Sequence, residues 1–151
     1  MKAEPQQEHR WLERMVGAWT YEGEYSMGPG QPSAKHAGSE VVRSLGGLWT
    51  IGEGEGEAPD GTKAQTVMTL GYDPEAKRFV GTFIASMMTY LWIYGGSLDE
   101  SGEVLSLDAE GPSFDGKGLV KYRDSMEFVD DGHRILTSSL AGEDGQWQRF
   151  M

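Results

Sequence analysis

The chain has 151 residues, about the length of one domain, and 22 of them are glycine. It carries 13 basic and 24 acidic side chains, and the net charge of −11 opposes binding to nucleic acids and to anionic membrane surfaces. The absence of cysteine from the sequence excludes disulfides, thiolate catalysis and zinc–sulfur sites.

The N-terminal segment "MKAEPQQEHRWLERMV" contains the one stretch with helical spacing. Its apolar residues recur at i, i+1, i+4 and i+5, as Trp11, Leu12, Met15 and Val16. This spacing predicts a short helix over residues 5–16, ended by Gly17, in which Trp11 and Leu12 act as a lid or plug. The segment lacks the apolar core of a signal peptide, and no stretch of the sequence reaches membrane-spanning length, so we expect a cytoplasmic protein.

Alternation of apolar and polar residues with a period of two begins at Gly17 and continues along the chain. Turn-forming residues interrupt it, among them Gly28-Pro29-Gly30, Pro59-Asp60-Gly61, Asp131-Gly132 and Asp144-Gly145. Between the turns we predict about ten strands, at residues 17–26, 37–45, 48–57, 64–72, 78–87, 90–98, 103–110, 118–130, 133–141 and 145–151. Strands joined by tight turns form an antiparallel meander, and closure into a barrel removes its free edges. The predicted fold is therefore one all-β barrel domain over residues 1–151, wide enough to keep a cavity.

The hairpin around Asp131-Gly132 predicts which side chains face the interior of this barrel. A two-residue loop places Asp124 directly opposite Ser139. The inner face then reads Tyr122, Asp124, Met126 and Phe128 against Ala141, Ser139, Thr137 and Ile135. A register slipped by one residue would bury the charged residues of the other face, so we expect this register. Asp124 is then the one ionisable group on the inner face of this hairpin.

A carboxylate in this position needs a hydrogen bond, a counter-charge or a proton, because desolvating it alone is costly. Ser139 and Tyr122 are its expected hydrogen-bond donors. Three roles for Asp124 remain open: a satisfied structural aspartate, a polar group that orients a ligand, and a general base in an apolar pocket.

The stretch "RFVGTFIASMMTYLWIYGG" at residues 78–96 is the most apolar part of the chain. A reversal near Met88-Thr89 places Phe83 opposite Tyr94. The tip of this hairpin carries Met87, Met88 and Leu91. An apolar tip is either the lip of a ligand entrance or a subunit interface, because exposed apolar patches mark contact sites and methionine adapts to varied apolar surfaces.

Carboxylates and glycines alternate in "WTIGEGEGE" at residues 49–57. An extended strand spaces alternate side chains by nearly 7 Å, which does not suit a calcium loop, so we expect a solvated acidic face. The glycines leave room for close approach of another backbone segment or for a sharp bend of the barrel. The three histidines, His9, His36 and His133, lack metal-ligand spacing. The sequence has no phosphate loop, dinucleotide fingerprint or nucleophile elbow, and we expect neither a metal nor a cofactor.

Several segments together resemble known proteins. A short N-terminal helix, Gly17-Ala18-Trp19 at the head of the first strand and a long meander resemble the calycin superfamily, which includes lipocalins and fatty-acid-binding proteins. More closely, the chain resembles the bacterial family catalogued as domain of unknown function 1579. The resemblance is carried by "EHRWLERMVGAW", "RSLGGLWTIGEGEGE", "MTLGYDPEAKRFVGTF", "MMTYLWIYGGSLD", "EGPSF" and "YRDSMEFV". It implies a lipocalin-like barrel and brings no established activity.

The calycin resemblance also implies roles for three residues that close the barrel. In calycins a basic residue on the last strand stacks over the tryptophan of the Gly-x-Trp motif. Gly17 and Trp19 match this motif, Arg149 is the candidate for the stacked residue, and relatives continue past the position of Met151 with further basic residues. The similar nitrobindin-type barrels hold haem through a histidine late in the chain. His133 is the late histidine here, and its place in a hairpin turn argues against haem.

Three functions remain open for such a barrel. The first is binding of a small apolar molecule in the interior. The residues expected to line that site are Trp49, Met87, Trp92, Tyr94, Tyr122, Asp124, Met126 and Ser139. The second is an isomerase or cyclase that uses Asp124 as an acid or base. The third is a homodimeric interaction module built on the Met87–Leu91 tip.

Overall fold

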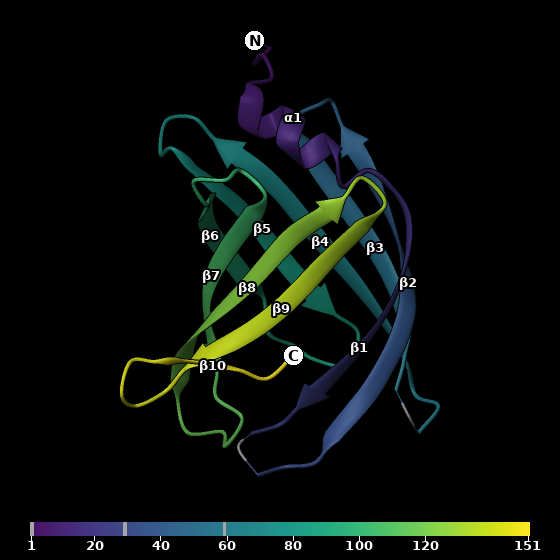
Figure 1. Cartoon of the computed structure of the whole chain (residues 1–151), viewed down its shortest axis with the longest axis vertical. Helices are drawn as coiled ribbons and strands as arrows, with labels where there is room; N and C mark the ends of the chain where they lie inside the picture. Colours follow the sequence, from purple (N-terminus) through teal and green to yellow (C-terminus); the bar gives the residue numbers. More distant parts are fainter. Residues whose placement is uncertain (1, 29, 59) are drawn as a thin grey trace.

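Ten antiparallel strands and one short helix make up the fold in a computed structural model, which describes residues 2–28, 30–58 and 60–151 (Figure 1). Pro29 and Pro59, in two of the predicted turns, lie outside the described residues. The elements are α1 (Gln7–Glu13), β1 (Gly17–Ser26), β2 (Ser33–Leu45), β3 (Trp49–Glu57), β4 (Lys63–Asp73), β5 (Arg78–Ala85), β6 (Trp92–Leu98), β7 (Val104–Pro112), β8 (Leu119–Asp130), β9 (His133–Ala141) and β10 (Trp147–Arg149).

The strands pair in chain order from β1 to β10, which confirms the predicted antiparallel meander. Across the described residues, no strand ladder joins β1 to β9 or β10, so the sheet is a strongly curled half-barrel rather than a closed barrel. The unpaired edges are residues 17–25 of β1 and 133–137 of β9, and we call this open side the seam. Among the described residues, one backbone hydrogen bond crosses it, from Ser26 N to Phe150 O at 2.8 Å.

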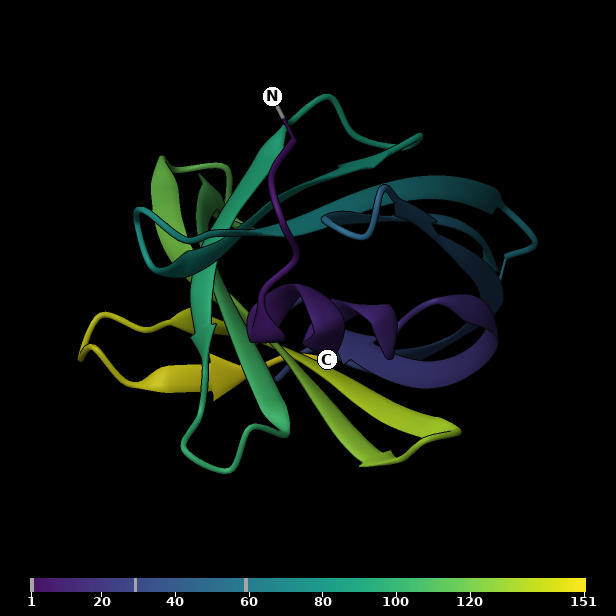
Figure 2. The ribbon, with the colours of Figure 1, turned by 90° about the horizontal axis from the view of Figure 1, so that it is seen from above.

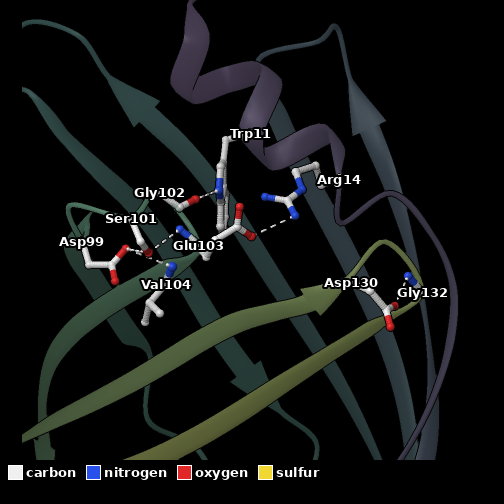
Figure 3. Close-up of polar contacts among 9 residues, drawn as sticks. All are labelled: Trp11, Arg14, Asp99, Ser101, Gly102, Glu103, Val104, Asp130 and Gly132. Atoms are coloured by element: carbon white, nitrogen blue, oxygen red, sulfur yellow. Dashed lines mark hydrogen bonds and ion pairs between the residues drawn. The ribbon is translucent and has the colours of Figure 1, made fainter.

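Helix α1 lies across one end of the half-barrel (Figure 2). Trp11 and Leu12 are buried, as expected for a plug, and the Trp11 ring meets Phe79 and Phe128 edge-on. Trp11 Nε1 donates to Gly102 O at 2.7 Å, and Arg14 pairs with Glu103 at 3.1 Å. Figure 3 shows both contacts, which tie the helix to the turn between β6 and β7. The helix is shorter than the predicted 5–16, and its packing rather than its length holds it in place.

The register of the β8–β9 hairpin differs from the predicted one by one residue. Asp124 lies opposite Ser138, not Ser139, because a bulge between Phe128 and Asp130 inserts an extra residue into β8. The side chain of Asp130 stabilises this turn by accepting hydrogen bonds from Gly132 N at 2.8 Å, also drawn in Figure 3, and from His133 Nδ1. The β8 face was predicted correctly and the β9 face was wrong. Arg134, Leu136, Ser138 and Leu140 turn inward, where the opposite set was expected.

The β5–β6 hairpin also has a different register. Phe83 lies opposite Trp92, and Tyr94 lies opposite Gly81, so the predicted Phe83–Tyr94 pair is wrong. The reversal is not a tight turn at Met88-Thr89, because β5 ends at Ala85 and β6 begins only at Trp92. A six-residue connection sets the register in place of a two-residue turn.

The two sides of the inner wall are built differently. On β5 to β8, large side chains fill the space beneath α1: Phe79, Leu105 and Leu107 are 0–2% exposed. On β2 and β3, glycines line the wall at Gly38, Gly52, Gly54 and Gly56. The Tyr21 ring lies over two of them, since a Cβ at Gly38 or Gly56 would come within 2.7 Å of its hydroxyl oxygen. The glycines of β3 therefore admit a close approach, but by the side chains of Glu40, Thr66 and Tyr21 rather than by the backbone segment that was predicted.

Candidate functional site

Asp124 lies on the inner face of β8 between two hydroxyl donors from neighbouring parts of the sheet. Tyr94 Oη, from β6, donates to Asp124 Oδ2 at 2.6 Å. Ser138 Oγ, from β9, donates to Asp124 Oδ1 at 2.6 Å. Each carboxylate oxygen therefore receives one short hydrogen bond, and each keeps a further lone pair for another donor.

Burial controls the protonation of this cluster. Loss of hydration raises the pKa of Asp124, and the hydrogen bonds from Ser138 and Tyr94 oppose that rise. Burial, followed by the charge and hydrogen bond of Asp124, raises the pKa of Tyr94 far above its ordinary value. Tyr94 therefore keeps its proton and acts as a donor at any physiological pH.

The surroundings of Asp124 are largely apolar. Leu107 is its partner on β7, and Tyr94, Leu105 and Met126 belong to the same buried cluster. In the part of the chain that the structure describes, no basic side chain lies within ion-pair distance of Asp124. The charge of the ionised carboxylate is therefore balanced by hydrogen bonds alone.

The structure brings together five of the eight residues predicted to line a ligand site. Tyr94, Tyr122 and Met126 are buried, Asp124 lies among them, and Trp92 meets Tyr122 edge-on with ring centroids 5.0 Å apart. Tyr122 was expected to donate to Asp124, but its hydroxyl donates to Pro112 O instead. The donor from β9 was missed because the bulge that aligns it with Asp124 leaves no mark in the Asp-Gly spacing.

The other three predicted residues lie elsewhere. Trp49 is 41% exposed and covers Gly71, beside a surface cavity of about 410 Å³ that it lines with His9 and Tyr72. Met87 is 63% exposed at the tip after β5. Ser139 lies opposite Arg123, whose side chain pairs with Asp108 on the outer face.

The stacking over Trp19 comes from a residue other than the predicted one. The guanidinium of Arg134 lies 4.5 Å from the centroid of the Trp19 ring and pairs with Glu40 at 2.6 Å, with 15% and 20% of the two side chains exposed. Arg149 is exposed and donates to Met151 O, because β10 pairs only with the far end of β9. Arg134 therefore links β9 to β1 and β2 across the seam, and it was missed because the predicted register turned it outward.

The start of the first strand follows the expected pattern in its backbone. Gly17 has φ +141°, a conformation that residues with a side chain rarely adopt. Trp19 Nε1 donates to Met15 O at 2.8 Å, which fixes the ring against the end of the helical segment. Gly17 thus permits the turn from helix to strand, and Trp19 is packed against the buried core.

His36 is a second titratable group on the inner wall. Its ring covers Gly23 and lies between Tyr21 and Tyr25, with centroid distances of 5.7 and 5.6 Å. Among the described residues, its buried Nε2 has no hydrogen-bond partner, and burial lowers the pKa of the imidazole. The loss of hydration at this ring therefore favours the neutral imidazole.

The described residues contain no cluster of three or more side chains suited to hold a metal ion. His133 pairs with Asp130 in an exposed turn, which confirms the predicted place of this histidine in a hairpin turn. A groove of about 610 Å³ crosses β1 to β3 beside Glu22, Lys35 and Glu57, and Asp124 lines neither this groove nor the cavity at Trp49. Within the described ranges, no helix has the length and apolar character needed to cross a membrane.

Comparison with known proteins places the whole barrel segment in one family. A comparison with curated protein sequences gives no match. A family model covers α1 and all ten strands, from residue 4 to residue 151. The chain therefore belongs to the family described as "Protein of unknown function (DUF1579)".

Proposed function

We propose that the interior of the half-barrel binds a small, mainly apolar molecule that carries a protonated amine, and that this amine engages Asp124. The observation that supports this is a largely buried carboxylate held by two hydroxyl groups, Tyr94 and Ser138, without a cation beside it in the described residues.

A buried carboxylate without a counter-charge is unfavourable even when it is hydrogen-bonded. The raised pKa of Asp124 reports this imbalance. An ammonium group would supply the missing charge and use the free lone pairs of the two carboxylate oxygens. The apolar part of the ligand would contact the neighbouring wall at Trp92 and Met126, where few polar groups compete with it.

The seam offers the route of entry. Helix α1 covers one end of the half-barrel, whereas residues 133–137 of β9 have an unpaired edge. Leu136, on the inner face beside Ser138, is 42% exposed, so water reaches the interior side of β9. A ligand that enters there would pass Ser138 on its way to Asp124.

A matched pair of amphiphiles tests this proposal. Nile red, a neutral apolar dye, is bound to the protein and then displaced by octylamine or by octanoate. We expect octylamine to displace the dye at a concentration at least about tenfold lower, which corresponds to one charge-assisted contact. Asp124→Asn removes this preference, whereas Glu127→Gln, an exposed carboxylate lost from the other face of the same strand, retains it.

Equal displacement by octylamine and octanoate would contradict the proposal. A preference for octylamine that survives Asp124→Asn would place the amine elsewhere, for example in the groove beside Glu22 and Glu57. Thermal unfolding of each variant without ligand shows whether the fold is intact before binding is compared.

A second candidate function is supported by the raised pKa of Asp124. A carboxyl group that gains a proton nearer neutral pH is suited to general acid–base catalysis, as in an isomerase or cyclase acting on an apolar substrate. Titration of the Asp124 carboxyl carbon by NMR tests this candidate. An ordinary aspartate pKa, near 3.9, would count against it.

We also infer kinship with the calycin barrels. The support is the order of features along the chain: a helix, Gly17 and Trp19 at the head of β1, a long meander, and an arginine stacked on Trp19. The arginine is Arg134 on β9, the last long strand of the sheet. A search of this half-barrel for topologically equivalent experimental structures tests the relationship.

A further inference from the structure

The outer face of β4, β5 and β6 has an unusual surface for an antiparallel sheet. Between the charged ends of these strands, the outward positions are Val67, Thr69, Gly71, Val80, Thr82, Ile84, Ile93 and Gly95. None of these eight carries a charge, although a quarter of the chain is charged and outer faces of such sheets are normally polar. Val67 and Ile84 lie directly opposite each other, and Ile93 lies opposite Thr82, diagonally across from Val80 and Ile84.

The connection from β5 to β6 follows directly on this face and carries three more exposed apolar side chains, of which Met88 also accepts a hydrogen bond from Trp92 Nε1 at 3.2 Å. Met87, Met88 and Leu91 are 63%, 41% and 50% exposed, and Ile84 and Ile93 are 48% and 65% exposed. We call these five residues, with Val67 and Val80, the outer patch. Isolated exposed apolar residues need no explanation, but a contiguous group of this size marks a contact surface.

Covering the outer patch would leave few polar groups unsatisfied. Thr69 Oγ1 and Thr82 Oγ1 form a hydrogen bond with each other at 2.7 Å, and Thr82 N also donates to Thr69 Oγ1 at 3.1 Å. The main-chain groups of β5 are already paired with β4 and β6. Removal of water from this face would therefore cost little hydrogen bonding.

Two charged side chains beside the outer patch are paired, and the guanidinium of Arg78 lies over Gly95. On the β3 side Glu53 lies 4.0 Å from Arg43, and on the β7 side Asp108 lies 2.7 Å from Arg123. The other carboxylates that alternate along β3, Glu55 and Glu57, follow Glu53 toward the C-terminal end of the strand. A chain with a net charge of −11 approaches a copy of itself most readily where carboxylates are few, and none occupies the eight outward positions of this face.

We propose that the outer patch is the interface of a homodimer, in which the β4–β6 faces of two copies pack against each other. The same surface on both subunits makes a closed two-fold contact, and two sheets packed face to face lie about 10 Å apart, as in a sandwich. The five exposed side chains present on the order of 500 Å² of apolar surface. With the surrounding strand residues this approaches the roughly 800 Å² per partner of a standard stable interface.

Sedimentation velocity over about 1–100 μM protein tests the proposal with three chains: the native sequence, Ile93→Lys and Val129→Lys. Ile93 and Val129 are 65% and 61% exposed, and Val129 lies on β8 outside the outer patch. We expect the native chain to be dimeric, Ile93→Lys to raise the dissociation constant at least about tenfold, and Val129→Lys to leave it unchanged. A lysine makes the net charge of the acidic chain less negative and so weakens the charge repulsion between two copies. Dissociation by Ile93→Lys therefore cannot be explained by stronger repulsion between the two chains.

Two results would overturn the homodimer. The first is a monomeric native chain at every concentration; flotation of that monomer with phosphatidylcholine vesicles would then assign the outer patch to a lipid surface. The second is a dimer that withstands Ile93→Lys. If Ile93→Lys lowers the thermal stability of the fold, Met87→Lys at the exposed tip replaces it with the same expected and contrary results.

Discussion

The β5–β8 side and the β2–β3 side of the inner wall share the same alternating sequence pattern, but they differ in the size of their inward-facing residues. On the β5–β8 side the inward positions carry large apolar residues, which fill the space beneath α1. On the β2–β3 side they carry glycines, so backbone, Tyr21 and Glu40 form the surface. One side supplies the packing free energy of the fold, and the other leaves room near the seam. Substitutions on the two sides should therefore have different effects.

The largest effect is expected on the packed side. Leu107 is 0% exposed, so Leu107→Ala should lower the free energy of unfolding by about 2–5 kcal/mol through lost burial and a cavity. Ile135→Ala, at a residue that is 47% exposed, should change it by less than about 0.5 kcal/mol. Urea denaturation measures both. Similar losses for the two variants would show that the β5–β8 side is not the core.

A smaller loss is expected at the seam. Glu40→Gln leaves the Arg134 guanidinium without its counter-charge in a mostly buried place and should cost about 2 kcal/mol. The matched control is Asp108→Asn, which breaks the more exposed pair with Arg123 and should cost less than about 1 kcal/mol. Replacing both seam partners, with Arg134→Met and Glu40→Leu, should recover part of the loss. No recovery in the double variant would indicate that the loss does not come from the unpaired charge of Arg134.

The glycine side should respond to added volume rather than to lost volume. A Cβ at Gly56 would lie 2.7 Å from the Tyr21 hydroxyl, the movable end of a side chain, so Gly56→Ala should cost about 1 kcal/mol by displacing the ring. Tyr21→Ala should make the same substitution nearly neutral. Denaturation of the two single variants and the double variant measures this coupling. Additive losses would show that the ring does not rest on Gly56.

The smallest effect concerns the pH dependence of stability. Because burial raises the pKa of Asp124 in the folded state, the folded protein binds this proton more readily than the unfolded chain does. Its contribution to stability is therefore unfavourable above the raised pKa and improves as the pH falls toward the ordinary aspartate value. The stability of the native chain minus that of Asp124→Asn should rise as the pH is lowered from 7 toward 4. A difference that falls over this range would mean that the hydrogen bonds outweigh burial.

The sequence predicted the fold more fully than the site. Strand positions were recoverable because Asp-Gly and similar turns recur between alternating runs, and Asp124 faced inward because the alternation on β8 is unambiguous. Ser138 and Arg134 were not recoverable, since both depend on a one-residue bulge that inverts the faces of β9. The open seam was also hidden, because alternation specifies which way a strand faces and not whether the first and last strands meet.

The links across the seam and from α1 also have a consequence for the order of folding. Each strand pairs with its neighbour in sequence, so most of the sheet can form through local hairpins. Other contacts join residues more than 90 positions apart, among them Trp11 with Gly102, Glu40 with Arg134 and Ser26 with Phe150. Loop closure makes such contacts slow to form. We therefore expect the ends of the sheet to join last on the way to the native state, and to separate first when it is lost.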